Sequence, residues 1–518
     1  MYKKYPIFLA LLLNGAGLLQ AAMLEPEQLQ NALTGNTNAC QPDITGLSDE
    51  AKQRLIGLYE RVEFRSIWDD TSRQAALKTA LGELENDGLT PADYLPSATN
   101  QAPICQELAL SHAYLSALKD LSFGKVGRGT LAPLWRAESD PAPSPTPTVV
   151  QYAVTGINES LANAFTSARP SSIHYQALRQ EYQRLKKTPG QSLPKVPNGP
   201  TLKPGMQDAR IPALAKHLSA RGYLPADRSF SYYDAELVQA VKAFQRDAQL
   251  QADGVLGPQS LKALNMDNAQ RLKILKVNLE RWRWLEHEMS DEQVLVDIAG
   301  GVLSYEKAGQ VLWQGRTQVG RLKRRTPEIK SNLNRVTLNP TWTIPPTILR
   351  EDKLPRIRRD PSFLARNGLK VIDRNGNVVS PSSVNWSNPG AYSLRQPAGP
   401  SNPLGKMVLR FDNPHSIYLH DTPSQHLFNR SSRDVSSGCV RVEGIASLLA
   451  ALVDEAELAQ ANRYLKTRQT HNQRLSRHIP ILLGYWTAQA DANGRVQLHS
   501  DIYNLDQALA QALDRPKK

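Results

Sequence analysis

The chain has 518 residues, of which 41% are hydrophobic, and its formal net charge is +13 at pH 7. It is too long for a single hydrophobic core and too apolar for a disordered chain, so we expect about three folded units. Basic residues are spread along the chain, and the one denser run, Arg321–Arg325, suits an anionic polymer or an ordinary solvated surface. No nucleic-acid-binding motif accompanies the charge, which argues against a nucleic-acid partner.

Residues 1–22 have the layout of an export signal. Lys3 and Lys4 give a positive start, Phe8–Leu19 an apolar stretch, and Ala21-Ala22 a cleavage zone of small residues. A membrane anchor is the alternative, but the apolar run is shorter than the roughly 18 residues that a span requires. No second stretch is apolar enough to cross a bilayer. We therefore expect a cleaved signal peptide and no stable membrane span.

Residues 25–190 predict a helical scaffold. Ser48 can cap a helix in which Leu55 and Leu58 recur at helical spacing. Trp68 and Trp135 are expected to anchor a core. The stretch from Asp140 to Thr148 is rich in Pro, Ser and Thr and predicts a loop or lid.

Two of the three cysteines, Cys40 and Cys105, fall in this region. An exported chain meets an oxidising compartment, so a disulfide between them and two buried free thiols both stay open. Cys439 has no partner left and stands in a different sequence context.

Residues 200–266 predict a bundle of three short helices, after a linker rich in Pro, Gly and Lys. Asp234 can cap the second helix, and Pro258 opens the third. The segments Leu218–Leu224, Ala240–Gln245 and Asp253–Gly257 resemble the peptidoglycan-binding type 1 domain. The resemblance implies binding to the cell-wall polymer, and a bundle kept only as a spacer is the alternative.

From about residue 290 the apolar pattern changes from helical to strand period. Residues 290–460 therefore predict a β-rich domain, and residues 461–518 a C-terminal extension. Some 60 residues between Pro345 and Pro403 are dense in Pro, Asn, Ser and charge, and a sheet does not need so long a connection. We expect an inserted lid at about 345–403. The whole chain is predicted to be an α+β multidomain protein.

Two segments of this domain carry chemistry, Ser416–Pro423 and Ser436–Arg441. His420 is expected to end a strand with its ring on the polar face, beside Tyr418 on the same side. Cys439 follows a tight turn of Ser437 and Gly438 that can aim backbone N–H groups at a developing oxyanion. A thiol is mostly protonated near neutral pH, and an imidazole within reach can take its proton.

A cysteine and a histidine alone are weak evidence, since a buried cysteine is more often an inert apolar residue. Among the other histidines, His426 is the competing base and His415 is expected in a loop. No metal-ligand cluster is evident in the sequence, and no cofactor is expected.

The turn with its histidine resembles the signature of the YkuD-type L,D-transpeptidase catalytic domain, in which a strand-ending histidine precedes a Ser-x-Gly-Cys-x-Arg turn. The resemblance implies Cys439 as nucleophile and His420 as proton donor and acceptor. Ser437, Gly438 and Tyr418 would shape the oxyanion and substrate site, and Arg441 would hold the loop or a substrate carboxylate. Many members carry a second histidine where this chain has Ser437.

The order of scaffold, peptidoglycan-binding module, lid and catalytic domain is similar to that of the larger periplasmic L,D-transpeptidases of Gram-negative bacteria. The resemblance implies a periplasmic enzyme that takes a tetrapeptide donor stem, releases D-Ala, and joins a diaminopimelate acceptor in a 3→3 cross-link. Two alternatives stay open: transfer of the same acyl group to water or a D-amino acid, and an inactive wall-binding scaffold.

Overall fold

The computed structural model describes residues 24–34, 46–95, 102–129, 131–137, 140–188, 195–226, 228–248, 250–390, 392–491 and 493–517. The expected signal peptide (1–22) and Cys40 lie outside the described residues. Cys105 is disulfide-bonded, and Cys439 has a free thiol. Within the described ranges no helix combines the length and the apolar character that crossing a bilayer requires.

The N-terminal unit consists of helices packed around one apolar core. Its elements are α1 (Pro26–Leu33), α2 (Asp49–Arg61), α3 (Thr71–Glu83), η1 (Leu84–Asp87), η2 (Pro91–Asp93), α4 (Pro103–Phe123), α5 (Pro145–Asn158) and α6 (Leu161–Ala168). Ser48 caps α2 as predicted, because its side chain accepts a hydrogen bond from the N–H of Ala51. Trp68 is buried in this core and donates to Ser111. The stretch predicted as a loop is helical from Pro145, since a proline at the first helical position loses no hydrogen bond.

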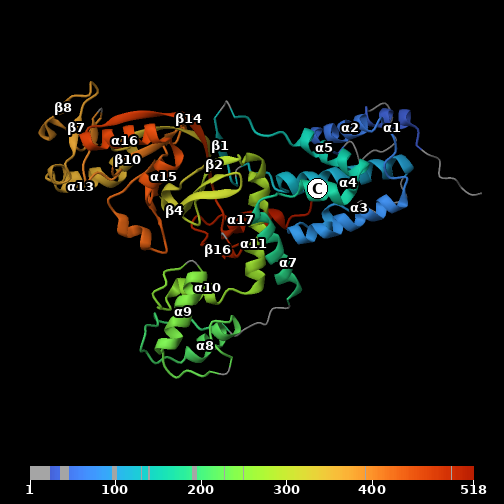
Figure 1. Cartoon of the computed structure of the whole chain (residues 1–518), viewed down its shortest axis with the longest axis horizontal. Coiled ribbons are helices and arrows are strands. Elements are labelled where there is room, and N and C mark those ends of the chain that lie inside the picture. The colour runs from blue at the N-terminus through green and yellow to red at the C-terminus, as the bar shows by residue number, and fades with distance from the viewer. Residues whose placement is uncertain are drawn as a thin grey trace, which may run out of the picture.

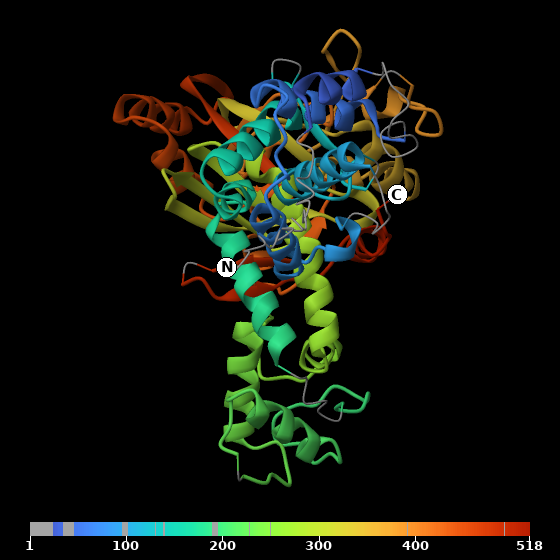
Figure 2. The ribbon, with the colours of Figure 1, turned by 90° about the vertical axis from the view of Figure 1, so that its right-hand side faces the viewer.

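Two long helices, α7 (Ile173–Lys187) and α11 (Asn268–Leu285), run from the body of the molecule toward the small bundle (Figure 2). With α17 (Asp506–Leu513) they form a second core that also takes in Leu482 and Trp486. Residues from the scaffold and from the C-terminal half therefore share one apolar interior.

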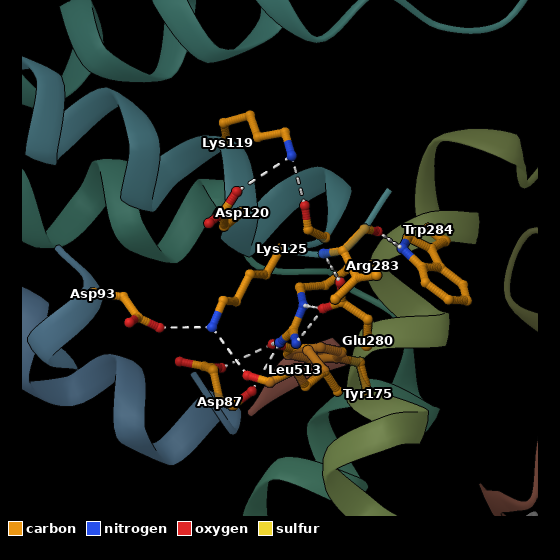
Figure 3. A network of polar contacts seen from close by, with 12 residues as sticks. Asp87, Asp93, Lys119, Asp120, Lys125, Tyr175, Glu280, Arg283, Trp284 and Leu513 are labelled. Carbon is orange, nitrogen blue, oxygen red and sulfur yellow. Dashed lines mark hydrogen bonds and ion pairs between the residues drawn. The ribbon is translucent and has the colours of Figure 1, made fainter. Parts of the chain in front are cut away.

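A buried polar network fixes α11 against the scaffold (Figure 3). Glu280 and Arg283 are both fully buried and form an ion pair at 2.7 Å. Arg283 also donates to the carbonyl of Asp87 at 2.8 Å and to the Tyr175 hydroxyl at 3.1 Å, while Glu280 accepts from the N–H of Val126. A buried charge is tolerable only when it is paired and hydrogen-bonded, so this network ties the two units at a defined position.

The C-terminal tail is also attached to the scaffold. The ammonium of Lys125 donates to the carbonyls of Leu513 and Arg515, at 3.0 and 2.9 Å. Lys517 pairs with the buried Asp120 at 2.8 Å. The last turns of the chain therefore bridge the C-terminal half and the N-terminal unit.

The small bundle contains α8 (Ile211–Ala220), α9 (Ala235–Asp247) and α10 (Pro258–Leu264), and it lies below the body of the molecule in Figure 1. Asp234 caps α9 through the N–H of Leu237. The side chain of Asn265 exchanges two hydrogen bonds with the backbone of Val196, so the chain enters and leaves the bundle at the same point.

The C-terminal half is organised by a ten-stranded sheet. Its strands are β1 (Leu134–Arg136), β2 (Glu292–Asp297), β3 (Val302–Lys307), β4 (Gln310–Gly320), β5 (Glu328–Leu338), β10 (Met407–Phe411), β11 (Leu419–His420), β12 (Asp434–Ser436), β13 (Val440–Val442) and β14 (His471–Gly484). The path runs β1-β5-β10-β11-β13-β4-β3-β2-β14, with β12 paired to β4 beside it. The last strand of the path, β14, also pairs with β5, and this second pairing of β14 closes the sheet on itself. Helix α15 (Ile445–Leu452) contributes to the core of the sheet, and α16 (Glu455–Thr467) follows it. The α+β multidomain prediction is confirmed.

The domain boundary that we predicted at residue 460 separates β14 from the other strands of this sheet. Strand β14 pairs in parallel with β2 and antiparallel with β5, so residues 471–484 belong inside the closed sheet. A two-stranded sheet of β15 (Ala488–Ala490) and β16 (Val496–Leu498) follows it. The C-terminal segment is therefore a structural part of the β-rich domain.

Between β5 and β10 the chain forms a small layer with its own apolar core. It contains β6 (Trp342–Thr343), α12 (Pro346–Ile348), the π-helical turn η5 (Leu349–Lys353), α13 (Leu354–Arg359), α14 (Phe363–Arg366), β7 (Lys370–Ile372), β8 (Val378–Val379), η6 (Pro381–Ser383) and β9 (Ser393–Gln396). This layer, called the lid below, lies at the end of the molecule away from the scaffold helices (Figure 1).

Candidate active site

Cys439 lies in the turn between β12 and β13, and several hydrogen bonds fix this turn. The hydroxyl of Ser436 donates to the carbonyl of Cys439 at 2.6 Å and accepts from the N–H of Gly438 at 3.1 Å. Thr326 donates to the carbonyl of Gly438 at 2.7 Å. Gly438 has φ of +120°, which a residue with a side chain rarely adopts, so glycine is required there. The turn holds the Cys439 thiol in one place.

The half-buried thiol of Cys439 faces the loop before β11. Its sulfur lies 3.6 Å from the carbonyl oxygen of Ser416, to which the thiol can donate. Burial raises the pKa of Cys439, while hydrogen bonds from the backbone and hydroxyl of Tyr418 and the charges of Arg441 and Arg410 act in the opposite direction. Burial dominates, so the protonated thiol is the resting form.

Tyr418 lies beside Cys439 because of the strand register. The carbonyl of Tyr418 accepts from the N–H of Val440, and β11 then pairs in parallel with β13. The strand predicted from Ser416 begins only at Leu419, because Ser416 adopts φ of +55° and interrupts the extended backbone. Burial is the main cause of the raised pKa of the Tyr418 hydroxyl, and the nearby Cys439 adds to it.

His420 is buried, with 4% of its surface exposed, and so does not lie on an open polar face as predicted. Its Nδ1 is 2.5 Å from the carbonyl oxygen of Asp421. A carbonyl only accepts, so Nδ1 carries the proton and Nε2 keeps a free lone pair. Burial and then the charge of Arg441 lower the pKa of His420 to about 3, so the imidazole is neutral at physiological pH.

Tyr418 contacts the ring of His420. The two rings pack edge to face, with centroids 5.7 Å apart and an interplanar angle of 65°. Among the described residues, Cys439 hydrogen-bonds with Ser416 and Tyr418. Tyr418 therefore contacts both the predicted base and the predicted nucleophile.

Two arginines flank the same group. Arg441 donates to Gln318 at 3.0 Å, and its buried Nε has no hydrogen-bond partner among the described residues. Arg410, which the sequence reasoning did not select, lies over the Tyr418 ring at 5.3 Å and donates to Thr337. A single charge inside the apolar strand Met407–Phe411 is the sequence signal that could have identified it.

Of the remaining predicted residues, Ser437 belongs to the turn that carries Cys439, whereas His426 and His415 lie in other segments of the chain. Ser437 is exposed at the turn and accepts a hydrogen bond from Arg324 at 3.1 Å. His426 and His415 are both exposed, on η7 (Gln425–Asn429) and in the loop before Ser416. Across the described ranges, no group of three or more His, Cys, Asp or Glu side chains is arranged to hold a metal ion.

Three family models match the chain. Residues 291–458 match "L,D-transpeptidase catalytic domain" (YkuD), residues 53–181 match "Scaffold domain", and residues 207–264 match "Putative peptidoglycan binding domain".

Two curated proteins are similar over parts of their length. A "Putative L,D-transpeptidase" of Haemophilus influenzae is 36% identical over 221 residues, which is 42% of this chain and 45% of that protein. The "N-acetylmuramoyl-L-alanine amidase CwlL" of Bacillus licheniformis is 41% identical over 76 residues, 14% of this chain and 21% of that protein. The chain thus spans less than half the length of each of these relatives.

Solved structures of L,D-transpeptidases are also similar. One from Xylanimonas cellulosilytica (residues 123–326) is 17% identical, covers 55% of this chain and 98% of that chain, and has a TM-score of 0.18. Another from Mycobacterium smegmatis is 14% identical, covers 37% and 58%, and has a TM-score of 0.17. TM-scores of this size carry no conclusion about the site.

Proposed function

Residues 291–458 form an L,D-transpeptidase catalytic domain of the YkuD family, and from this premise we propose that the chain forms 3→3 cross-links in peptidoglycan through a thioester on Cys439. The domain works beside a scaffold domain and a peptidoglycan-binding domain. The observation that carries the proposal is a free thiol fixed in a turn next to Tyr418, with a neutral imidazole behind it whose Nε2 is free to accept a proton. We further propose that the chain is exported to the periplasm, where its polymer lies.

In the first half-reaction the Cys439 sulfur attacks the carbonyl of the third stem residue, a diaminopimelate L-centre. The thiol proton passes to Nε2 of His420, directly or by way of the hydroxyl of Tyr418, which contacts both residues. The same proton then leaves on the amine of D-Ala as the C–N bond breaks. The product is a thioester, and His420 is again neutral.

The second half-reaction reverses the proton transfer. The side-chain amine of an acceptor stem attacks the thioester, gives up a proton to His420, and forms the new amide as sulfur leaves. The proton returns to sulfur, so the enzyme ends in its starting state. No cofactor enters this sequence.

The oxyanion needs backbone donors, and here the geometry refines the sequence assignment. The N–H of Gly438 already donates to Ser436. The N–H of Cys439 itself has no hydrogen-bond partner in the described part of the chain, and we assign oxyanion stabilisation to it. Arg441 and Arg410 add positive charge near the sulfur, which favours an anionic tetrahedral intermediate.

We assign to the lid the task that distinguishes a transferase from a hydrolase, which is to exclude water from the thioester. A thioester that waits for an amine must be kept from water, and a layer with its own core next to the catalytic turn suits that task. Hydrolysis or exchange with a D-amino acid through the same thioester is the competing activity.

One experiment separates these activities. The mature chain and its Cys439→Ala variant are incubated with purified tetrapeptide muropeptides, and the products are separated by mass. A cross-linked dimer with loss of D-Ala supports transpeptidation, and tripeptide alone assigns carboxypeptidase activity. No product from the folded wild-type chain would indicate an inactive wall-binding scaffold.

A further inference from the structure

Arg324 lies beside the catalytic turn, and two carboxylates of the lid cover its guanidinium. Its Nη1 donates to Ser437 at 3.1 Å and to one oxygen of Asp352 at 2.7 Å. Its Nη2 donates to the other oxygen of Asp352 at 3.0 Å and to Glu351 at 2.6 Å. The pair with Asp352 is bidentate, the geometry in which arginine recognises a carboxylate best.

The backbone that carries Arg324 is tied to the catalytic turn. Thr326, two residues later, accepts from the N–H of Gly320 at 2.9 Å and donates to the carbonyl of Gly438 at 2.7 Å. The Tyr503 hydroxyl accepts from the N–H of Thr326 at 3.0 Å and donates to the carbonyl of Gly320 at 2.6 Å. Arg324 therefore keeps its position relative to Cys439.

The two carboxylates belong to a separately packed layer. Glu351 and Asp352 lie in η5 of the lid, whose apolar core is distinct from the core of the closed sheet. Their side chains are 48% and 34% exposed, whereas that of Arg324 is 10% exposed. The lid can therefore shift as a layer without unpacking the sheet, and its carboxylates would then leave an arginine that stays in place.

We propose that Arg324 is a carboxylate-binding subsite for the stem peptide, and that Asp352 and Glu351 of the lid occupy it while the site is empty. This inference rests on the proposed function, because its ligand is a carboxylate of the donor stem. Ser437, which shares the guanidinium, stands two residues before the nucleophile. A substrate carboxylate near the scissile bond is thus close enough for the Arg324 guanidinium to bind it.

The lid carboxylates and the substrate carboxylate therefore compete for one cation, the guanidinium of Arg324. Arg321 approaches Asp352 at 3.5 Å but is itself 44% exposed, so it helps hold the lid and is not enclosed like Arg324. Ion pairs with partly exposed carboxylates are weak enough to exchange, and a substrate carboxylate offers the guanidinium an equivalent partner. Substrate binding and lid displacement become one step.

The test uses the full chain with four tetrapeptide donors. One donor is unmodified, and in each of the other three a single carboxylate is amidated: that of D-Ala, of the D-Glu residue or of diaminopimelate. The values of kcat/KM are compared for wild type, Arg324→Gln, Arg324→Lys and Lys323→Gln. Lys323 is exposed in the same loop, so its variant removes the same charge without touching the lid carboxylates.

We expect wild type to prefer the unmodified donor over one amidated donor by about tenfold, the size of one charged hydrogen-bonded contact. The amidated donor that wild type uses less well than the unmodified one identifies the carboxylate that Arg324 binds. Arg324→Gln should erase the preference, Arg324→Lys should keep part of it because the charge remains without the fork, and Lys323→Gln should keep it fully.

The complementary variant removes the competitors. Asp352→Asn with Glu351→Gln should raise kcat/KM for the unmodified donor several-fold, whereas Asp373→Asn, which changes a half-buried lid carboxylate in a separate turn, should not change it. The subsite is overturned if wild type treats all four donors alike, if Arg324→Gln keeps the preference, or if the double variant lowers kcat/KM. A folded wild-type chain that acts on none of the donors refutes the proposed function itself.

Discussion

Nδ1 of His420 is hydrogen-bonded to the carbonyl oxygen of Asp421 at 2.5 Å, which leaves Nε2 as the basic atom of the ring. The bond comes from the residue that follows in the chain, so it forms wherever this strand end forms. It orients the imidazole and defines its tautomer before any substrate binds. The following prediction depends on that role.

His420→Ala should reduce the rate of acylation by about a hundredfold or more, the usual contribution of a general base. His426→Ala is the matched control, because His426 is exposed on η7, outside the turn that carries Cys439. Stopped-flow acylation with a tetrapeptide donor measures both, and Cys439→Ala gives the zero level. A larger loss in His426→Ala than in His420→Ala would reassign the base.

The thiol and imidazole should rest as a neutral pair. Burial raises the pKa of Cys439, and burial with the charge of Arg441 lowers the pKa of His420 to about 3, so neither group favours a thiolate–imidazolium pair. The alkylation rate of Cys439 by iodoacetamide should therefore be low at pH 7 and rise about tenfold per pH unit toward pH 9. A rate that is high and flat between pH 5 and pH 8 would indicate a preformed ion pair instead.

A buried carboxyl should make stability depend on pH. Burial raises the pKa of Asp297 to about 7, and the charged or titratable groups near it are His499, Arg281 and Arg433. The raised pKa means that its stabilising contribution is complete below the unfolded value near 3.8 and is lost as pH rises through about 7.

Asp297→Asn keeps the hydrogen bond from Gly300 and cannot ionise, so it should raise the melting temperature at pH 8 by about 10 °C. The expected gain is about 1.4 kcal/mol per unit of pKa shift, and about 2 to 4 °C per kcal/mol for a domain of this size. The same variant at pH 4 should match wild type. An equal shift at both pH values would show a packing effect and no titration.

The buried pair on α11 should matter for stability far more than an exposed pair at the same spacing. Glu280→Gln leaves Arg283 charged and fully buried, and we expect a loss of about 3 to 5 kcal/mol in the free energy of unfolding. Glu181→Gln breaks an i,i+3 pair with the exposed Arg184 on α7 and should cost about 0.5 kcal/mol or less.

Urea unfolding followed by tryptophan fluorescence measures both variants, since Trp282 and Trp284 flank Arg283. Adding Arg283→Met to Glu280→Gln should recover part of the loss, because the unpaired charge is removed with its partner. Equal costs for Glu280→Gln and Glu181→Gln would mean that the network in Figure 3 does not hold the two units together.

Deleting the small bundle should weaken binding to isolated wall sacculi while leaving Cys439 reactive. The bundle has its own core, and its ends meet where Asn265 binds Val196, so residues 196–265 can be replaced by a short Gly/Ser linker. Co-sedimentation with sacculi measures binding, and iodoacetamide labelling of Cys439 checks the remaining fold. Unchanged sedimentation would leave the bundle as a spacer.

Helix caps and the turn around the proposed nucleophile could be predicted from the sequence alone. Helix caps such as Ser48 and Asp234 act through neighbours three residues away, and the apolar period separates helix from strand within short windows. The turn around Cys439 was also readable, because a glycine is required where φ is +120°. These constraints are local, so they depend only on residues that are close together in the chain and can be recognised in the sequence.

The surroundings of the thiol depend on packing between distant segments. The closure of the sheet by β14 across some 180 residues, the contacts of Tyr418 with Cys439 and His420, and the burial of His420 depend on strand pairings that no local pattern encodes. The contacts of Arg324 with Asp352 and Ser437 likewise join the lid to a turn more than 80 residues away. Burial and long-range charge set the pKa values and the partners of these groups, and both arise only when distant segments pack together.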